Sequence, residues 1–560
     1  MKSPSRLLAG ALLVVSTAAA DRPSAGRAAP PEVRRAAGKI TEELLRAHTK
    51  ILASDLLEGR GPATRGDSLA EAYIQSQMEA LGVEPGAPGG GWIQKVPLVG
   101  VKASFSGPAV FRSERGSAEG VPGDNFVAFS GVQKPAAKIE DAEIVFVGYG
   151  IVAPEFRWDD YKDADLSGKV LLMMNNDPES DPSIFAGKTR LWYGRWDYKY
   201  LMAAKKGAAG AILIHTTPSA GYPWHVVQNS WAGENFELPD DGSPRVQIKM
   251  WATEELARTV AKLAGKDLDS LLASAESRSF RPAPLGVRFS FAMANAIVQK
   301  ESGNVVGRIP GGDPKLSGEA VVYTAHHDHF GIKAKPGAGS EDSIYNGAVD
   351  NASGVASILS VARAFAELGT PPRRTVYFAF VAAEEQGLLG SQYFVAHPPV
   401  PVGRIAANIN IDSASWFGKT SDVSLIGLGK SSLDGDVIAV AKTQGRTVKP
   451  DEFPDRGLFY RSDQFNFAKA GVPAAYVKFG TDVIGKPAGW GKEQVEAYQK
   501  NTYHQPSDEY HDDLDFAGAV EDARLAFLLG CRVADADAMP RWRPGDEFEA
   551  ARKKALALVP

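Results

Sequence analysis

The chain has 560 residues, more than one compact hydrophobic core supports, so two or more domains are expected. Its formal net charge of −5 and ordinary share of charged residues exclude the basic character typical of nucleic-acid binders. Its single cysteine, Cys531, excludes an internal disulfide, which leaves core burial and metal binding as sources of stability.

The first 20 residues have the pattern of a secretory signal. Lys2 and Arg6 precede an apolar run from Leu7 to about Ala20, which ends in small residues. The run is too short to span a bilayer comfortably, so no membrane span is predicted. We therefore expect residues 1–20 to be a signal peptide and the chain to be exported to the periplasm or the medium.

Residues 21–130 are expected to be the leading part of a domain that the second half of the chain completes. Residues 21–38 are rich in Ala, Arg and Pro and predict a flexible lead. A helical spacing of apolar residues follows from Ile40 to about Gly82, interrupted by a polar turn at Asp55–Gly61.

Residues 131–284 predict a smaller inserted α/β domain with its own core. Strands are expected at 144–149, 170–174 and 211–214, and a helix at 199–207, with Gly- and Pro-rich turns around them. The aromatic segment Trp192–Tyr198 either packs in this core or lines a substrate cleft, and the sequence leaves both readings open.

Residues 285–560 alternate between strand and helix. Strands are expected at 304–309, 320–325, 374–382, 406–411, 423–426 and 474–477, with a helix at 352–368. Such alternation is typical of a doubly wound α/β sheet with helices on both faces.

The run His326-His327-Asp328-His329 ends the apolar strand at 320–325. Because strand side chains alternate between faces, His326 and Asp328 point to one side and His327 to the other. Open α/β sheets build their sites where strands end. Taken alone, the run could equally be a hydrogen-bonded core histidine.

Other polar residues also lie at element boundaries. Asp350 precedes a helix, Glu384 and Glu385 follow a strand, Asp412 follows the next strand, and His504 lies in a loop. Each has an ordinary alternative as a helix cap, a helix start, a turn or a surface residue. As a set they are expected at one edge of one sheet.

Imidazoles and carboxylates without thiols favour zinc or a similar borderline metal. Two histidines and three carboxylates are too many ligands for one tetrahedral ion, but they suit two ions that share a bridging carboxylate. The adjacent pair Glu384-Glu385 then supplies one metal ligand and one general base.

These motifs resemble the two-zinc bacterial aminopeptidases, a group that also contains glutamate carboxypeptidase and the transferrin receptor. The similar runs are Thr324–Gly331, Gly347–Gly354, Ala383–Gly387, Asn410-Ile411-Asp412, Arg461-Ser462-Asp463 and Tyr503-His504. The resemblance implies a doubly wound mixed α/β sheet of the zinc-exopeptidase type, in which residues 131–284 are a protease-associated insert and residues 285–560 the zinc peptidase domain.

The resemblance also implies the metal ligands. His326, Asp350 and Asp412 would hold one Zn²⁺, while Asp350, Glu385 and His504 would hold the other, with Asp350 as the bridge. Co²⁺ or Mn²⁺ are alternative ions.

Three further roles follow from the same resemblance. Glu384 would be the general base, Asp328 would orient His326, and Tyr503 would donate a hydrogen bond to the developing oxyanion. Many relatives have a histidine where this chain has Gln464, a position that does not ligate metal.

The implied activity is removal of N-terminal amino acids from peptide substrates. A carboxypeptidase or dipeptidase on the same site is an alternative, as are a one-zinc glutaminyl cyclase and a non-catalytic receptor-like module. No nucleic-acid partner is expected.

Overall fold

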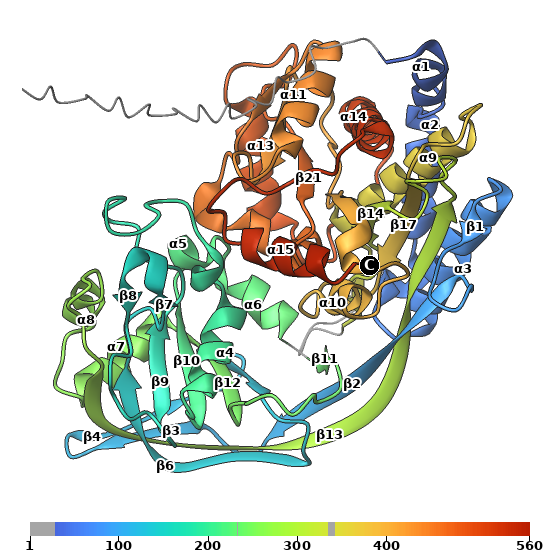
Figure 1. Cartoon of the computed structure of the whole chain (residues 1–560). Coiled ribbons are helices and arrows are strands. Elements are labelled where there is room, and N and C mark those ends of the chain that lie inside the picture. Colours follow the sequence, from blue (N-terminus) through green and yellow to red (C-terminus); the bar gives the residue numbers. More distant parts are fainter. Residues whose placement is uncertain (1–28, 232, 334–341, 560) are drawn as a thin grey trace, which may run out of the picture.

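The computed structural model describes residues 29–231, 233–333 and 342–559, so the predicted signal peptide lies outside the described residues. Within these ranges no helix has the length and apolar character needed to cross a membrane. A large mixed sheet runs through the molecule (Figure 1). The strands and helices around it form two α/β units, a larger and a smaller one, which lie beside each other.

The larger unit is built on parallel strands. Strand β14 (Ala320–His326) lies between β17 (Thr375–Val381) and β18 (Ile405–Asn410) and is parallel to both. Beyond β18 come β21 (Ala474–Phe479), which is parallel to it, and β19 (Asp422–Ile426), which is antiparallel to β21. The sheet is therefore mixed, and its strands match those expected from the sequence.

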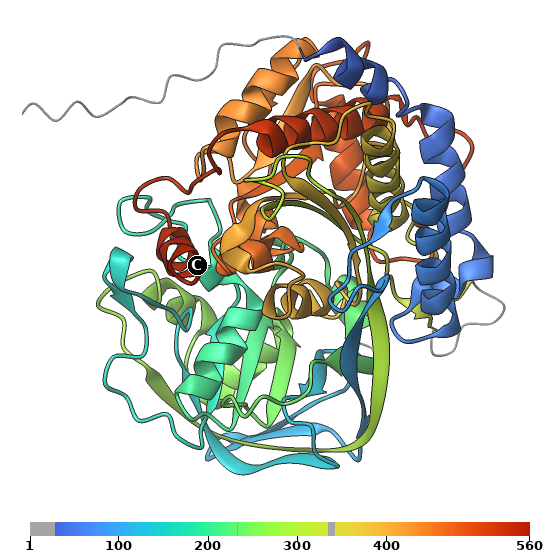
Figure 2. The ribbon, with the colours of Figure 1, turned by 45° about the vertical axis from the view of Figure 1, so that its right-hand side comes forward.

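Helices cover both faces of this sheet (Figure 2). Val321 and Tyr323 pack in one core with α2 (Glu42–Leu52), α9 (Ser353–Ala366) and α14 (Ala517–Asp535). Val322 points to the opposite face, into a core with α10 (Leu389–Ala396) and α12 (Gln464–Lys469). The two-residue alternation along β14 thus places one apolar set on each face, as in doubly wound sheets.

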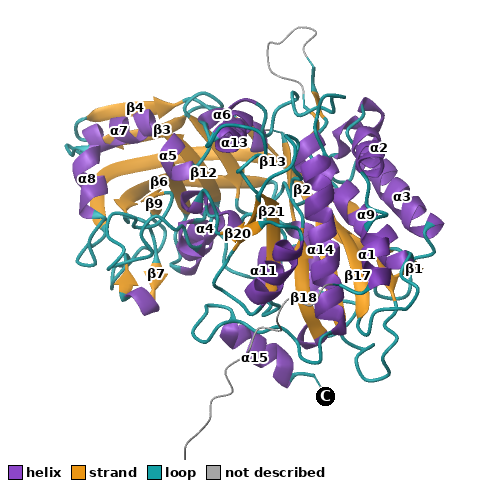
Figure 3. Ribbon diagram, turned by 90° about the horizontal axis from the view of Figure 1, so that it is seen from above, coloured by secondary structure: helices purple, strands orange, loops and turns teal. Residues whose placement is uncertain are grey.

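The smaller unit contains another part of the same large sheet, in which β9 (Val170–Met174), β10 (Gly210–His215) and β12 (Ile248–Thr253) are parallel. Helix α4 (Trp196–Lys205) covers one face, while α7 (Glu254–Leu263) and α8 (Leu268–Ser274) cover the other. Viewed from above, the two units lie side by side (Figure 3).

One long strand joins the two units. Strand β13 (Ala283–Ile309) has 27 residues and pairs with β6 (Ala136–Phe146), β2 (Ile93–Phe105) and finally β17. The core of the smaller unit draws on residues from Ala109 to Met293, beyond both limits of the expected 131–284 insert. At the upper limit, β13 begins at Ala283 and continues into the larger unit, past a register shift between Pro284 and Arg288 in its pairing with β6.

A buried arginine ties the N-terminal segment to the loops of the larger unit. Arg60 ends the 3₁₀ helix at Asp55–Arg60 and donates to the carbonyl oxygens of His327 at 2.8 Å, Asn346 at 2.7 Å and Gly347 at 3.1 Å, and also to that of Leu52. Burial lowers the pKa of Arg60 to about 10, so its guanidinium stays charged at neutral pH.

Replacing Arg60 with Met should remove these hydrogen bonds and leave buried carbonyl groups without partners. We expect the free energy of unfolding to fall by about 3 kcal/mol, measured by urea denaturation. Arg65→Met, at an exposed residue paired with Glu58, is the control and should change stability little. Equal stability of Arg60→Met and Arg65→Met would contradict a stabilising role for the hydrogen bonds of Arg60.

His48 should make stability depend on pH. Its ring Nδ1 lies 2.8 Å from the hydroxyl of Tyr73, and burial, aided by Arg363, lowers its pKa to about 4. The unfolded chain binds a proton near pH 6.5 and the folded chain does not, so stability is full above pH 6.5 and is lost as the pH falls toward 4.

The loss attributable to His48 should reach about 3 kcal/mol across that window. His48→Gln should remove this part of the pH dependence of the unfolding free energy, whereas the same change at exposed His397 should keep it. An unchanged pH profile in His48→Gln would refute the assignment.

Candidate metal centre

The predicted ligands converge at the carboxyl edge of the larger sheet. His326 ends β14, Glu385 follows β17, Asp412 follows β18, and Asp350 precedes α9. His504 follows α13 (Trp490–Asn501) in the chain. Potential ligand atoms of His326, Asp350 and Glu385, and of His326, Glu384 and Asp412, lie within 4.8 Å of one another.

Asp350 lies at the middle of the cluster. Its Oδ1 is 3.2 Å from Nε2 of His326, and its Oδ2 is 3.4 Å from Nε2 of His504. Each histidine has a second carboxylate nearby, Asp412 at 3.7 Å from His326 and Glu385 at 3.1 Å from His504. Each half of the cluster has one histidine that faces Asp350 and one carboxylate of its own, and Asp350 is common to both. In the second half, that of His504, Nδ1 of His329 also lies 2.7 Å from Oε1 of Glu385.

Both histidines present a free nitrogen to this centre. Their Nε2 atoms are buried and make no hydrogen bond within the described residues. The Nδ1 atoms on the other side of each ring are held, by the carbonyl oxygen of Asp328 at 3.1 Å for His326 and by Ser230 Oγ at 3.2 Å for His504. This is how metal-binding histidines are normally oriented, and the nitrogen and oxygen donors fit zinc.

The excess of carboxylates raises the proton affinity of the histidines. Burial alone would lower the pKa of His504, but Glu385 and Asp350 outweigh it and raise the pKa to about 9. Buried carboxylates at such distances need compensating positive charge, which a divalent cation would supply.

Glu384 lies beside the cluster and lines the open space next to it. Burial raises the pKa of its carboxyl well above the ordinary value, opposed by His326 and reinforced by Glu385 and Asp412. A raised pKa suits a carboxylate that accepts a proton from another group.

Asp328 holds the turn that carries the two glutamates. Its Oδ1 and Oδ2 accept hydrogen bonds from the backbone N–H groups of Glu384 at 3.0 Å and Glu385 at 3.3 Å. Oδ1 also lies 3.7 Å from Nδ1 of His326, whose closer partner is the carbonyl oxygen of the same aspartate. The side chain of Asp328 therefore contacts both His326 and the turn that carries Glu384 and Glu385, and its shortest contacts are to this turn.

Tyr503 packs directly on the centre. Its ring stacks on that of His504 with 3.7 Å between centroids, and its hydroxyl accepts a hydrogen bond from Nη2 of Arg461 at 3.3 Å. Burial raises the pKa of Tyr503 well above its usual value, so the hydroxyl keeps the proton that an oxyanion needs from it.

Two contacts escaped the sequence analysis. Asp508 accepts hydrogen bonds from the backbone N–H groups of Val349 at 3.0 Å and Asp350 at 3.1 Å, and so fixes the loop that carries Asp350. The only sequence feature that pointed to Asp508 is its position in the same short segment as His504. Ser230 ends α6 (Trp224–Ser230) of the smaller unit and had no signal at all.

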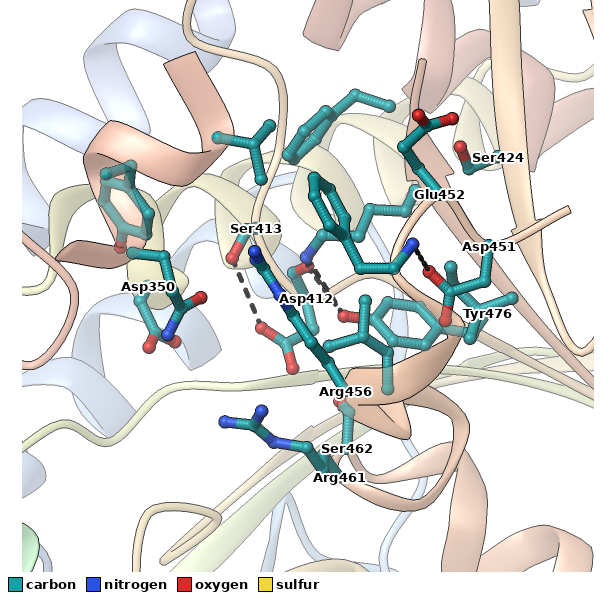
Figure 4. Close-up of a pocket in the computed structure, with 18 of the residues that line it drawn as sticks. Asp350, Asp412, Ser413, Ser424, Asp451, Glu452, Arg456, Arg461, Ser462 and Tyr476 are labelled. Atoms are coloured by element: carbon teal, nitrogen blue, oxygen red, sulfur yellow. Dashed lines mark hydrogen bonds between the residues drawn. The ribbon is translucent and has the colours of Figure 1, made fainter. Parts of the chain in front are cut away.

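Two cavities flank the centre. The first has a volume of about 890 Å³ and extends from Asp350 and Asp412 to Asp451, with aromatic walls (Figure 4). The second, of about 980 Å³, lies between the two units of the fold and is lined by Glu385 and His504. Glu384, Arg461 and Tyr503 line both cavities.

Comparison with known proteins gives related sequences. The probable lipoprotein aminopeptidase LpqL of Mycobacterium tuberculosis is 28% identical over 267 residues, 44% of this chain and 47% of that protein. Leupeptin-inactivating enzyme 1 of Streptomyces exfoliatus is 26% identical over 265 residues, 44% of this chain and 51% of that protein. The matched region thus spans about half the length of these curated relatives.

The fold matches a solved structure over most of its length. The aminopeptidase from Aneurinibacillus sp. strain AM-1 superposes with a TM-score of 0.50 at 18% identity, covering 92% of this chain and 97% of that one. Residues 304–528 match the family model of Peptidase family M28. All five predicted metal ligands lie within this matched M28 segment.

Proposed function

We propose that this chain is an exported zinc aminopeptidase that hydrolyses the peptide bond after a free N-terminal residue. The observation that carries the proposal is the position of Asp350 between the Nε2 atoms of His326 and His504, each with a further carboxylate nearby. The relatives named as aminopeptidases, and the shared fold, support the same activity.

Two Zn²⁺ ions fit the ligand set, one held by His326, Asp350 and Asp412 and the other by Asp350, Glu385 and His504. When bound, such a pair polarises the scissile carbonyl and lowers the pKa of water toward neutrality. The two-ion count rests on the two histidines facing opposite oxygens of Asp350.

The side chains of the protein divide the proton transfers. The carboxylate of Glu384 takes a proton from the attacking water and returns it to the nitrogen of the leaving amine. The hydroxyl of Tyr503, held by Arg461, donates a hydrogen bond to the oxygen on which negative charge develops. The carboxylates of the first cavity suit the positive charge of a free N-terminus.

The remaining assignments are part of this proposal. The smaller unit, expected over residues 131–284, would be a protease-associated domain, with residues 21–130 and 285–560 forming the peptidase domain around it. The charged start and apolar run of residues 1–20 support export.

Glu384→Gln tests the general base. Zinc content should persist, while kcat for leucine p-nitroanilide should fall about 100-fold or more because the amide cannot take the proton. Glu367→Gln, at the exposed end of α9, is the matched control and should keep its activity. Near-normal turnover of Glu384→Gln would remove Glu384 from this role.

Substrate acetylation and metal analysis separate the alternatives. An aminopeptidase should release p-nitroaniline from leucine p-nitroanilide and leave the N-acetylated compound intact, because acetylation removes the charge of the N-terminus. Equal hydrolysis of both would favour an enzyme indifferent to the free amine. A zinc content near one ion per chain would favour the cyclase arrangement.

Ser230→Ala tests the support of His504. Loss of the hydrogen bond to Nδ1 should weaken zinc affinity about tenfold, measured by competition with a chelator. Ser76→Ala, at an exposed position of α3 (Arg65–Ala80), provides the control. Unaltered zinc affinity in Ser230→Ala would show that His504 needs no such support.

A further inference from the structure

The second cavity contains two buried arginines from different units of the fold. Arg195 immediately precedes α4 in the smaller unit, and Arg461 belongs to the M28 segment. Both line the cavity together with the metal-centre residues Glu385 and His504. The smaller unit therefore contributes positive charge next to the proposed reaction centre.

Neither guanidinium has a carboxylate partner at hydrogen-bond distance within the described residues. Nε of Arg195 makes no hydrogen bond, and its carboxylate neighbour Asp197 lies 3.7 Å away, although the Arg195 side chain is only 12% exposed. Arg461 donates to the neutral hydroxyl of Tyr503, and no carboxylate oxygen of the described residues lies within 4.0 Å of it. A buried charge without a close partner is costly unless a ligand completes it.

The third cationic side chain that lines the second cavity, Lys249, does have a close carboxylate partner. Lys249 lies 2.6 Å from Oε1 of Glu237, which also pairs with Arg245 at 2.6 Å. This part of the cavity wall is neutralised within the protein. Of the arginine and lysine side chains that line this cavity, Arg195 and Arg461 are thus the two without a hydrogen-bonded carboxylate.

Acidic side chains outnumber basic ones in the lining of the first cavity, which includes Asp412 and Asp451. Arg195 lines only the second cavity, whereas Arg461 and Glu384 line both. A peptide with a free N-terminus in the first cavity and a carboxylate in the second would match both.

We propose that Arg195 and Arg461 bind a carboxylate on the leaving part of the substrate, so that the enzyme prefers short peptides with a free carboxyl end or peptides with an acidic residue after the scissile bond. This inference rests on the proposed aminopeptidase function and specifies its substrate class. Guanidinium groups suit the task, because their planar forks bind carboxylates through two parallel hydrogen bonds.

The position of Arg461 sets how far that carboxylate is from the scissile bond. Its Nη2 lies 3.3 Å from the hydroxyl of Tyr503, whose ring stacks at 3.7 Å on that of the ligand His504. Arg461 therefore lies close to the proposed centre, so the carboxylate that it would bind belongs to a residue near the scissile bond.

The experiment compares three substrates that share the scissile bond after leucine. Leu-Ala carries an α-carboxylate, Leu-Ala-NH2 carries none, and Leu-Asp-NH2 carries a side-chain carboxylate. Native zinc-loaded protein should give kcat/KM for Leu-Ala or Leu-Asp-NH2 about tenfold or more above that for Leu-Ala-NH2. Whichever acid is preferred identifies the source of the carboxylate.

Arg195→Met should reduce this preference about tenfold, and Arg195→Lys should restore part of it, since Lys keeps the charge but not the fork. Arg461→Met, a substitution in the larger unit, should also reduce the preference for the acidic substrates. It replaces the Arg195 variants as the test if those do not fold. Arg112→Met, an exposed arginine on β3 (Ala109–Ser113) of the smaller unit, is the matched control and should keep the preference.

Two results would overturn the inference while leaving the proposed function intact. One is hydrolysis of leucine p-nitroanilide with equal kcat/KM for all three peptides. The other is a preference for the acids that persists in both Arg195→Met and Arg461→Met. Failure of the native zinc-loaded protein to hydrolyse leucine p-nitroanilide would instead count against the proposed function.

Discussion

The concentration of buried carboxylates at one sheet edge is the constraint on which the site depends. Asp350, Glu384, Glu385 and Asp412 all lie around two imidazoles where β14, β17 and β18 end. At low dielectric such charges repel strongly. They stay together only when hydrogen bonds from other parts of the chain hold their positions and a cation balances their charge.

The fixing is done by polar groups that do not ligate metal. Asp328 binds the backbone of the glutamate turn, Asp508 binds the backbone at Asp350, and Arg60 binds the carbonyl groups of the two neighbouring loops. Because each of these contacts uses backbone groups, the loop positions follow from main-chain hydrogen bonds rather than from the ligands themselves.

The smaller unit contributes residues to the site. The continuous strand β13 and its partner β2 run along both units, and this shared ladder sets their relative position (Figure 1). As a result, Ser230 meets His504 and Arg195 lines the same cavity as Arg461. Such an arrangement lets one unit carry the reaction chemistry while the other shapes the space for the leaving part of a substrate.

The sequence by itself determined the larger sheet and the position of the ligand set. Apolar runs such as Val321–Ala325 predict parallel strands by composition, and the ends of parallel strands meet at one edge whatever the loops do, so His326 and Asp412 could be placed together. The role of Asp350 came from the resemblance of its motif.

Only the tertiary structure decided the contacts between the units. Ser230 and His504 are 274 residues apart, and no local pattern links them or joins Arg195 to Arg461. The extent of the smaller core was equally hidden, because alternating buried residues continue along β13 past residue 284, beyond a register shift in its pairing with β6. Local periodicity encodes elements and their ends, whereas the pairing of distant surfaces depends on how whole sheets pack.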